Sequence, residues 1–362
     1  MASSTIRKRE IRTALRERAD AWQREFFRHE LLTARYVRGV QLEAEADFQR
    51  RVVRPLLFQL PAKLAAVRAR GDDYTRDMFP AMASMLDDIS RTIAKGADAA
   101  GKLTAKRMAE IAEREVEWTA SALKRAAPEV KAEVGRELGK DAAGEAAQGT
   151  KDRIWLGDTT ERVFARDLGE KTGEAVRRTI TTAQKHGLSV DGTVKLLRGS
   201  PGKSGILAEK PVYTIRGLVR SAATHASSEG RMASYRALGV THWRFIATLD
   251  QRTTIQCASE DGNTYPLDEG PIPPLHVNCR SSVAPVIEGM EPFGTRASIK
   301  GPVSAKTNFE EWLAQLPQDE QEMVLGKTKA RAWRAGKLTL KQMLGADLQP
   351  LTLAELEGLD LL

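Results

Sequence analysis

Residues 240–247 read Val240-Thr-His-Trp-Arg-Phe-Ile-Ala247, and they end a long series of helical patterns. Their alternation and their β-branched and aromatic side chains predict a strand. A second strand is predicted at Ser282-Val-Ala-Pro-Val-Ile287. The polar, proline-rich stretch between the two strands contains both cysteines of the chain, Cys257 and Cys279, with His276 three positions before the second. Ordering such a connection costs about 1–2 kcal/mol per residue, so specific contacts must brace it.

The chain before residue 240 has apolar residues at helical spacing, with charged residues between them. Gly187 and Gly239 directly follow two of these patterns, at positions where a left-handed residue commonly ends a helix. Several glycines fall within residues 126–150, which indicates a weak helix or a linker there. We therefore expect helices over residues 5–54, 61–70, 81–95, 102–125, 159–186 and 214–238.

These patterns predict a mainly α protein. An elongated helical N-terminal region is expected to precede a compact α+β C-terminal domain, in which a Pro/Cys/His-braced loop joins short strands. A chain of 362 residues is long enough for two or three domains. We place the boundaries near residues 150 and 295: an Arg-rich helical region over 1–150, a second domain over 151–295 and a helical tail over 296–362.

The composition excludes several classes of protein. Hydrophobic residues make up 41% and charged residues 29%, and the mean hydropathy is -0.39, which is typical of a soluble globular chain. The N-terminus has no apolar signal region and no stretch of about 18 apolar residues occurs, so we expect neither secretion nor a membrane span. Two cysteines are too few for a disulfide framework, and a reducing compartment is expected.

The net charge of +8 resides entirely in the first 70 residues, where arginine is by far the commonest basic residue. Two interpretations are open. The segment could contact packaged DNA or an acidic protein surface, in which case binding weakens steeply with salt. Alternatively, the charges belong to a solvated helix with intrahelical ion pairs. The residues assigned to a DNA or portal-type contact in the first interpretation are Arg7, Lys8, Arg9, Arg12 and Arg16.

Three explanations compete for the cysteines and the nearby histidine. Cys257, His276 and Cys279 could bind one structural zinc ion, with Asp250 or a water completing a tetrahedron, because thiolate and imidazole suit that ion. The two thiols could instead form a disulfide, which would stabilise the fold by about 3 kcal/mol in the chain-entropy model. Finally, both cysteines could be small buried hydrophobic residues, with the histidine held by hydrogen bonds.

Asp250, Arg252 and Arg280 form a carboxylate and guanidinium set in the same stretch. In the structural interpretation, Asp250 caps a turn and pairs with an arginine across the loop. In the catalytic interpretation, Asp250 is a general base beside a metal-bound water. The catalytic interpretation requires further motif residues, such as the His-x-Glu and Pro-Cys-x-x-Cys of a zinc deaminase, and the sequence lacks them. We therefore expect no enzymatic activity and no catalytic residue.

The stretch as a whole resembles the signature of the phage Mu F-type minor head proteins, also called head morphogenesis proteins. The resemblance covers about residues 210–356, and some members carry further cysteines where Thr254 and Ser281 stand here. Because this chain lacks those cysteines, Asp250 is the only nearby residue that could replace them as a zinc ligand. The residues that carry the signature are Asp250, Arg252, Cys257, Asp261, Gly262, Pro273, Pro274, His276, Cys279, Arg280 and Ser281, followed by tail matches at Phe309, Trp312, Gly326, Lys327, Gly336 and Leu338.

The resemblance implies a structural virion protein of a tailed phage. Such a protein is made in the host cytoplasm and resides inside the head near the portal vertex. Its implied partners are the portal protein and the major capsid or scaffolding protein, and its implied roles are head assembly and DNA packaging or ejection. An alternative function is non-specific binding to packaged DNA through the basic N-terminal helices. A metal-dependent hydrolase centred on Asp250 is a third alternative.

Overall fold

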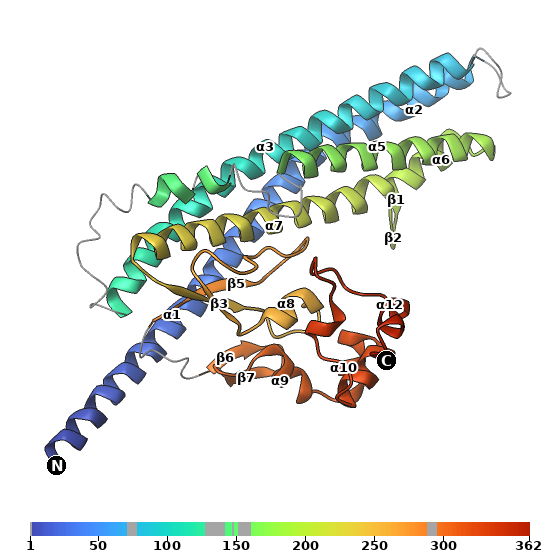
Figure 1. Ribbon diagram of the computed structural model, residues 1–362. Helices are drawn as coiled ribbons and strands as arrows, with labels where there is room; N and C mark the ends of the chain where they lie inside the picture. The colour runs from blue at the N-terminus through green and yellow to red at the C-terminus, as the bar shows by residue number, and fades with distance from the viewer. Residues whose placement is uncertain (1, 71–77, 127–141, 147, 151–160, 288–294) are drawn as a thin grey trace. The chain divides into compact units, whose positions relative to one another are not determined.

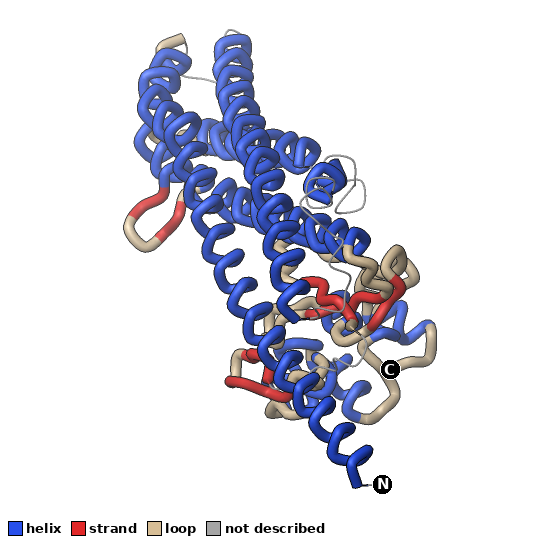
Figure 2. Tube along the Cα trace, turned by 90° about the vertical axis from the view of Figure 1, so that its left-hand side faces the viewer, coloured by secondary structure: helices blue, strands red, loops and turns tan. Residues whose placement is uncertain are grey.

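The computed structural model describes residues 2–70, 78–126, 142–146, 148–150, 161–287 and 295–362. The predicted fold class is confirmed: the protein is mainly α, with long helices in the N-terminal region and an α+β C-terminal region with small sheets (Figures 1 and 2). Within the described ranges, no helix combines the length and the apolar character needed to cross a membrane.

The helical region contains the predicted helices, except that the two expected over residues 81–95 and 102–125 form one continuous helix, α3 (Met78–Ala126). Its elements are α1 (Ala2–Phe48), the π-helical turn η1 (Gln49–Val53), α2 (Arg54–Arg68), α3, α5 (Glu161–Lys185), α6 (Val190–Arg198), the strands β1 (Gly199–Ser200) and β2 (Lys203–Ser204), and α7 (Ile206–Ala237).

The C-terminal region has shorter elements. They are β3 (His242–Ile246), α8 (Ile255–Glu260), β4 (Thr264–Pro266), β5 (Ser282–Val286), β6 (Thr295–Ser298), β7 (Gly301–Ser304), α9 (Phe309–Ala314), α10 (Gln318–Leu325), α11 (Lys327–Arg334), η2 (Lys341–Met343) and α12 (Leu353–Gly358). The tail expected to be helical thus begins with a β-hairpin, in which Thr295 pairs with Ser304.

The contacts group the chain into two compact units. The first unit contains Met1–Ala34, Ala109–Trp155 and Ala223–Leu362, and the second contains Arg35–Met108 and Leu156–Ala222. These units are not the contiguous ranges expected from the sequence, because α1, α3 and α7 each contribute residues to both.

The second unit is built from helices in close contact. Gly96 of α3 lies against Val52, where a β-carbon would come within 2.0 Å of a Val52 methyl group. Gly169 of α5 likewise lies against Ala94 and Ala97 of α3. The small residues that weaken these helices in isolation therefore allow their backbones to pack closely. The buried apolar side chains of this unit include Leu56, Leu60, Leu64, Ile89, Ile93, Val176, Ile180 and Leu218.

The first unit contains an antiparallel sheet of strand order β4-β3-β5. Alternate residues of β3, Trp243 and Phe245, are buried on one face of this sheet, as the alternating pattern predicts. The hydroxyl of Tyr235 in α7 donates to the carbonyl of Val283 at 3.1 Å, which satisfies one polar group of β5. Both cysteines and Tyr235 belong to the apolar cluster on this face.

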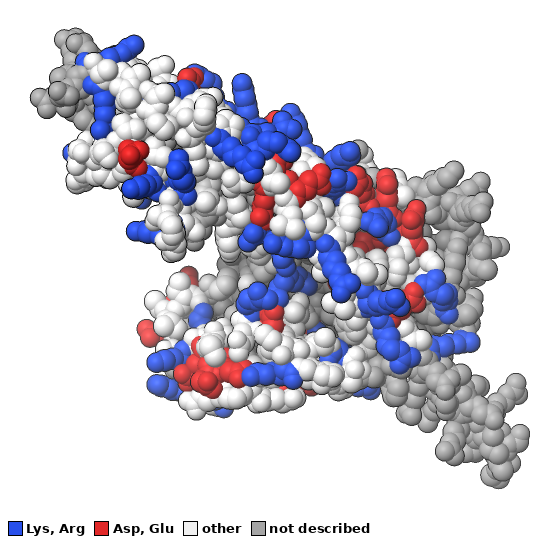
Figure 3. All heavy atoms as spheres, turned by 180° about the vertical axis from the view of Figure 1, so that it is seen from behind, with Lys and Arg blue, Asp and Glu red and all other residues white. Residues whose placement is uncertain are grey.

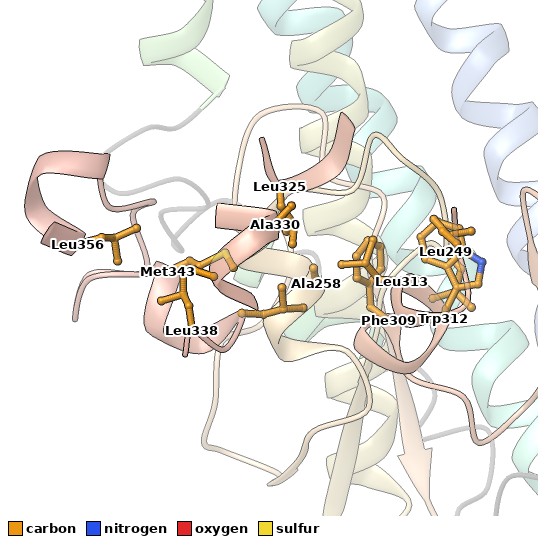
Figure 4. Close-up of a cluster of buried hydrophobic side chains, with 13 residues drawn as sticks. Leu249, Ala258, Phe309, Trp312, Leu313, Leu325, Ala330, Leu338, Met343 and Leu356 are labelled. Carbon is orange, nitrogen blue, oxygen red and sulfur yellow. The ribbon is translucent and has the colours of Figure 1, made fainter. Parts of the chain in front are cut away.

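A second apolar cluster of the first unit joins α8 to the short C-terminal helices. Figure 4 shows Leu249 beside Trp312, with Phe309 and Leu313 next to them. Asn308 and Thr352 each form a capping box that starts one of these helices, α9 and α12. The loop that carries the cysteines is therefore anchored between two buried clusters.

Candidate functional site

The cysteines and His276 are brought together by α8 and by the loop that precedes β5. Gly239, with a φ of 69°, ends α7 in the left-handed conformation and leads into β3. Cys257 lies on α8, and Cys279 lies at the end of the long loop, three residues before β5. The peptide bond between Pro273 and Pro274 in this loop is cis.

Cys257, His276 and Cys279 form a compact group of potential metal ligands. One ligand atom from each of the three lies within 4.8 Å of the others. The two sulfur atoms are 3.6 Å apart, and both thiols are free and buried. Two thiolates on a tetrahedral zinc ion, with Zn–S bonds of 2.3 Å, lie about 3.8 Å apart. The separation in the protein matches a metal site better than a disulfide, whose sulfurs are about 2.04 Å apart.

A backbone hydrogen bond orients the imidazole of His276. Its Nδ1 lies 2.8 Å from the carbonyl oxygen of Val277. A carbonyl oxygen can only accept, so Nδ1 carries the proton and donates. The other ring nitrogen, Nε2, is then the atom that can bind a metal ion. Burial alone would lower the pKa of His276, but the hydrogen bond and charge of Cys279 outweigh burial and raise it, so metal binding would release a proton from this ring.

The two thiols differ in acidity because they lie against each other. The hydrogen bond from Cys257 to Cys279, reinforced by His276, holds the pKa of the Cys279 thiol well below its ordinary value. The same contact and burial raise the pKa of the Cys257 thiol. Cys279 is thus the more acidic of the two thiols, and thiolate is the form that binds metal ions.

Thr254 lies one helical turn before Cys257 and borders the group. This threonine occupies the N-cap of α8 but makes no side-chain cap hydrogen bond. Its hydroxyl interacts instead with the Cys257 thiol, and this interaction favours the thiolate of Cys257. The two thiols and the imidazole fit a metal ion with three protein ligands.

Asp250 does not belong to this group. Its carboxylate accepts two hydrogen bonds from Arg280, at 2.5 Å and 2.6 Å, in a bidentate pair. It also accepts from the backbone N–H of Arg252 at 3.0 Å, which forms the predicted turn. Burial of Asp250 opposes its ionisation, but the hydrogen bonds and charge of Arg280 outweigh burial and lower its pKa. The predicted fourth ligand is therefore engaged by arginine, and the structural interpretation of this set holds.

The other residues of the predicted motif shape the loop. Gly262 has a φ of 87°, a left-handed conformation that glycine adopts without strain in the turn between α8 and β4. Pro274 is buried and follows the cis bond. The side chain of Arg252 is 81% exposed and lies 3.6 Å from Asp250, so this arginine braces the loop far less than Arg280.

The sequence did not indicate a second brace of this region, the buried pair of Asp261 with Arg296. Arg296 of β6 donates to both carboxylate oxygens of Asp261, at 2.9 Å and 3.1 Å, and this carboxylate side chain is fully buried. The same guanidinium donates to the carbonyl oxygens of Ala247 and Thr307. The Asp-Gly turn was a visible signal for Asp261, but no pattern connects it with an arginine 35 positions later.

The predicted basic contact residues Arg7, Lys8, Arg9, Arg12 and Arg16 have side chains outside the described residues. Later arginines of the same segment have internal partners, since Arg50 and Arg51 both bind Asp47 at 2.6 Å. On the face drawn in Figure 3, lysine and arginine side chains lie among aspartate and glutamate side chains. For Arg50 and Arg51, the ion-pair interpretation is therefore the better one.

Comparisons with known proteins give no relative: no family model, no curated protein and no solved structure matches the chain.

Proposed function

We propose that this chain is a structural minor head protein of a tailed phage, associating with the portal protein and with the capsid or scaffolding protein during head assembly. The proposal rests on the resemblance of residues 210–356 to the Mu F-type minor head proteins. It places the protein inside the head near the portal vertex, where it would also meet DNA during packaging or ejection.

One observation carries the proposal: the polar residues of the resembling motif bind one another. Asp250 is held by Arg280, and Asp261 is held by Arg296. A hydrolase of this kind needs a carboxylate that is free to accept a proton from a metal-bound water. Because Asp250 is ion-paired and its pKa is lowered, it is a poor general base. The arrangement favours a rigid platform for a protein partner over a catalytic centre.

We further assign the Cys257, His276 and Cys279 group to one structural zinc ion. Two buried thiols and an imidazole are soft ligands that suit zinc, and magnesium and calcium prefer oxygen ligands. A zinc ion would join α8 to the end of the long loop. It would thereby stabilise a segment that has only a small apolar core of its own.

Co-expression with the portal protein of the same phage tests the proposed function. We expect the two proteins to co-purify in a fixed ratio by size-exclusion chromatography with light scattering. The variant Asp250→Asn, which removes one charge from the bidentate pair, is expected to weaken this association by loosening the platform. Arg252→Gln is the matched control, because its exposed side chain contributes little.

Absence of a complex between the wild-type chain and the portal protein would contradict the assignment. So would turnover of nucleic acid or peptide substrates by the purified chain that is lost in His276→Ala. Binding to DNA through residues 1–70 stays a prediction, since no contact among the described residues favours it.

A further inference from the structure

The first unit contains a cavity of about 380 Å³ beside strands β3 and β5 of the sheet. Trp243 and Phe245 of β3 face the cluster, so the alternate residues Arg244 and Ile246 face the opposite side and line the cavity. Ala284, the cross-strand partner of Arg244, lines it as well.

Aromatic residues of α1 form the second wall. Trp22, Phe26 and Phe27 line the cavity, and the ring of Trp22 stacks on Trp118 with centroids 5.8 Å apart. Gln23 donates from Nε2 to the carbonyl oxygen of Thr295 at 2.9 Å, which ties α1 to the start of β6. These contacts leave a preformed recess with aromatic side chains on one wall and polar side chains on the other, of a size that suits a small ligand or an inserted side chain.

The charged residues around the recess include more cations than anions. Arg244, Asp261, Arg296 and Lys306 line it. Arg296 and Asp261 neutralise each other in the buried pair described above. Among the described residues, the only hydrogen bond of the Arg244 side chain is a long one, 3.5 Å from Nε to Thr264, and the ammonium of the exposed Lys306 has no ion pair there. In the part of the chain that the structure describes, these two cations therefore have no carboxylate partner beside the recess.

From this combination we infer that the recess is a docking site for an acidic, apolar peptide of a partner protein. An aliphatic or aromatic side chain would enter between α1 and the sheet, and neighbouring carboxylates would bind Arg244 and Lys306. An anchor side chain in a pocket, flanked by charge pairs at the rim, is the usual arrangement of a specific peptide site.

Nucleic acid fits the recess less well. A strand of DNA or RNA presents one phosphate per nucleotide and is held by a run of cations along its path. Here only two unpaired cations among the described residues flank a concave, half-apolar recess, which is fewer than such a strand requires. The inference stands independently of the proposed head function, because it rests on the recess alone.

Selection of peptides from a random dodecapeptide library on the purified full chain tests this site. We expect the enriched peptides to contain aspartate or glutamate next to leucine, isoleucine, phenylalanine or tryptophan. The best peptide, synthesised with a fluorescent label, is then measured by fluorescence polarisation. The double variant Arg244→Gln/Lys306→Gln is expected to bind it about tenfold more weakly or worse, which corresponds to about 1.4 kcal/mol.

The matched control is Lys337→Gln/Lys341→Gln, which removes the same charge from two exposed lysines outside the recess and should bind as the wild type does. Phe27→Ala tests the apolar wall separately and is also expected to weaken binding. Thermal unfolding of each variant checks that the fold is retained. Peptides that bind the charge variant and the wild type equally would overturn the inference. It is also overturned if a twelve-residue oligothymidylate binds in a manner that requires Arg244 and Lys306, because the site would then be a nucleic-acid site.

Discussion

The guanidinium of Arg231 in α7 donates from Nε to the carboxylate of Glu115 in α3 at 2.9 Å, and both side chains are only 2% exposed. The same guanidinium binds Glu30 of α1 and donates to the hydroxyl of Ser282 in β5. One arginine thus connects three helices and the sheet of the first unit. Its Cζ atom also lies 5.1 Å from the ring centroid of Phe26, where a cation is attracted by the aromatic face.

Replacing Arg231 with methionine is expected to destabilise the first unit severely. Methionine has a similar length but leaves Glu115 buried without its cationic partner, and breaking a buried ion pair in this way costs about 3–5 kcal/mol. Urea denaturation followed by circular dichroism measures the change in free energy of unfolding. Arg236→Met is the control on the same helix: its ion pairs involve the exposed Glu145 and Asp268, so about 1 kcal/mol or less is expected. Equal losses in the two variants would contradict the role of Arg231.

The stability contributed by Glu115 is expected to depend on pH in the acid range. Burial alone would raise the pKa of Glu115. The charge of Arg231 and the contact with His29 outweigh burial and lower this pKa from 4.5 to about 2. Because the folded-state pKa is depressed, this contribution is complete above about pH 4.5 and is lost as the pH falls toward 2. At 1.36 kcal/mol per pKa unit it amounts to about 3 kcal/mol.

Glu115→Gln isolates this contribution from that of the other carboxylates. The difference in free energy of unfolding between wild type and variant, measured by urea denaturation from pH 7 down to pH 2, should shrink by about 3 kcal/mol. A difference that stays constant over that range would show that Glu115 does not titrate in this way.

The zinc assignment predicts about one zinc per chain in protein purified without chelator. Elemental analysis measures the metal content, and substitution with Co²⁺ should give the intense absorption of tetrahedral thiolate coordination. Cys257→Ser and His276→Ala are expected to lose the metal. His242→Ala is the control, because that exposed histidine lies outside the ligand group and should leave the zinc content unchanged.

Removing the metal should also lower the thermal midpoint, because a structural zinc binds the folded state and not the unfolded chain. Substoichiometric zinc in freshly purified protein, together with no Co²⁺ spectrum, would exclude the site. In that case the close thiols are left as buried apolar residues.

Local patterns predicted much of this fold, because they report which face of an element is buried. Helical spacing placed α1, α5 and α7, and alternation placed β3 and β5. The sequence-based prediction was wrong at Gly96, because it relied on the low helix propensity of glycine. The sequence suggested separate helices over 81–95 and 102–125, but α3 continues through Gly96. The missing β-carbon lets this part of the helix pack against Val52, and that packing offsets the low propensity.

At the candidate site, the sequence predicted the pairs that lie within one loop and missed those that depend on the tertiary fold. The pairing of Asp250 with Arg280 follows from their charges and from the need to brace the loop. Two other ion pairs join elements that are far apart in the chain, and a single sequence carries no signal for such contacts. They are the pairs of Arg231 with Glu115 and of Asp261 with Arg296. The recess beside Arg244 was equally invisible, since it depends on where α1 lies within the first unit.

Two glycine-to-alanine substitutions are expected to have opposite effects on stability. At Gly230 in α7, a β-carbon would come within 2.6 Å of the carbonyl oxygen of Ala112 and 2.8 Å of the Glu115 β-carbon. The contact with backbone cannot be relieved by a side-chain rotation, so α7 and α3 must separate. Such overpacking costs about 1–3 kcal/mol, which exceeds the gain of about 1 kcal/mol in helix propensity.

At Gly39 in α1, by contrast, no atom lies within 4 Å of the added β-carbon. Only helix propensity then changes, and Gly39→Ala should stabilise the protein by about 0.5–1 kcal/mol. Urea denaturation of both variants measures the two signs in one experiment. If Gly230→Ala were as stable as the wild type, α7 and α3 would not pack as closely as the structure shows, and the buried contact of Arg231 with Glu115 would lose its geometric basis.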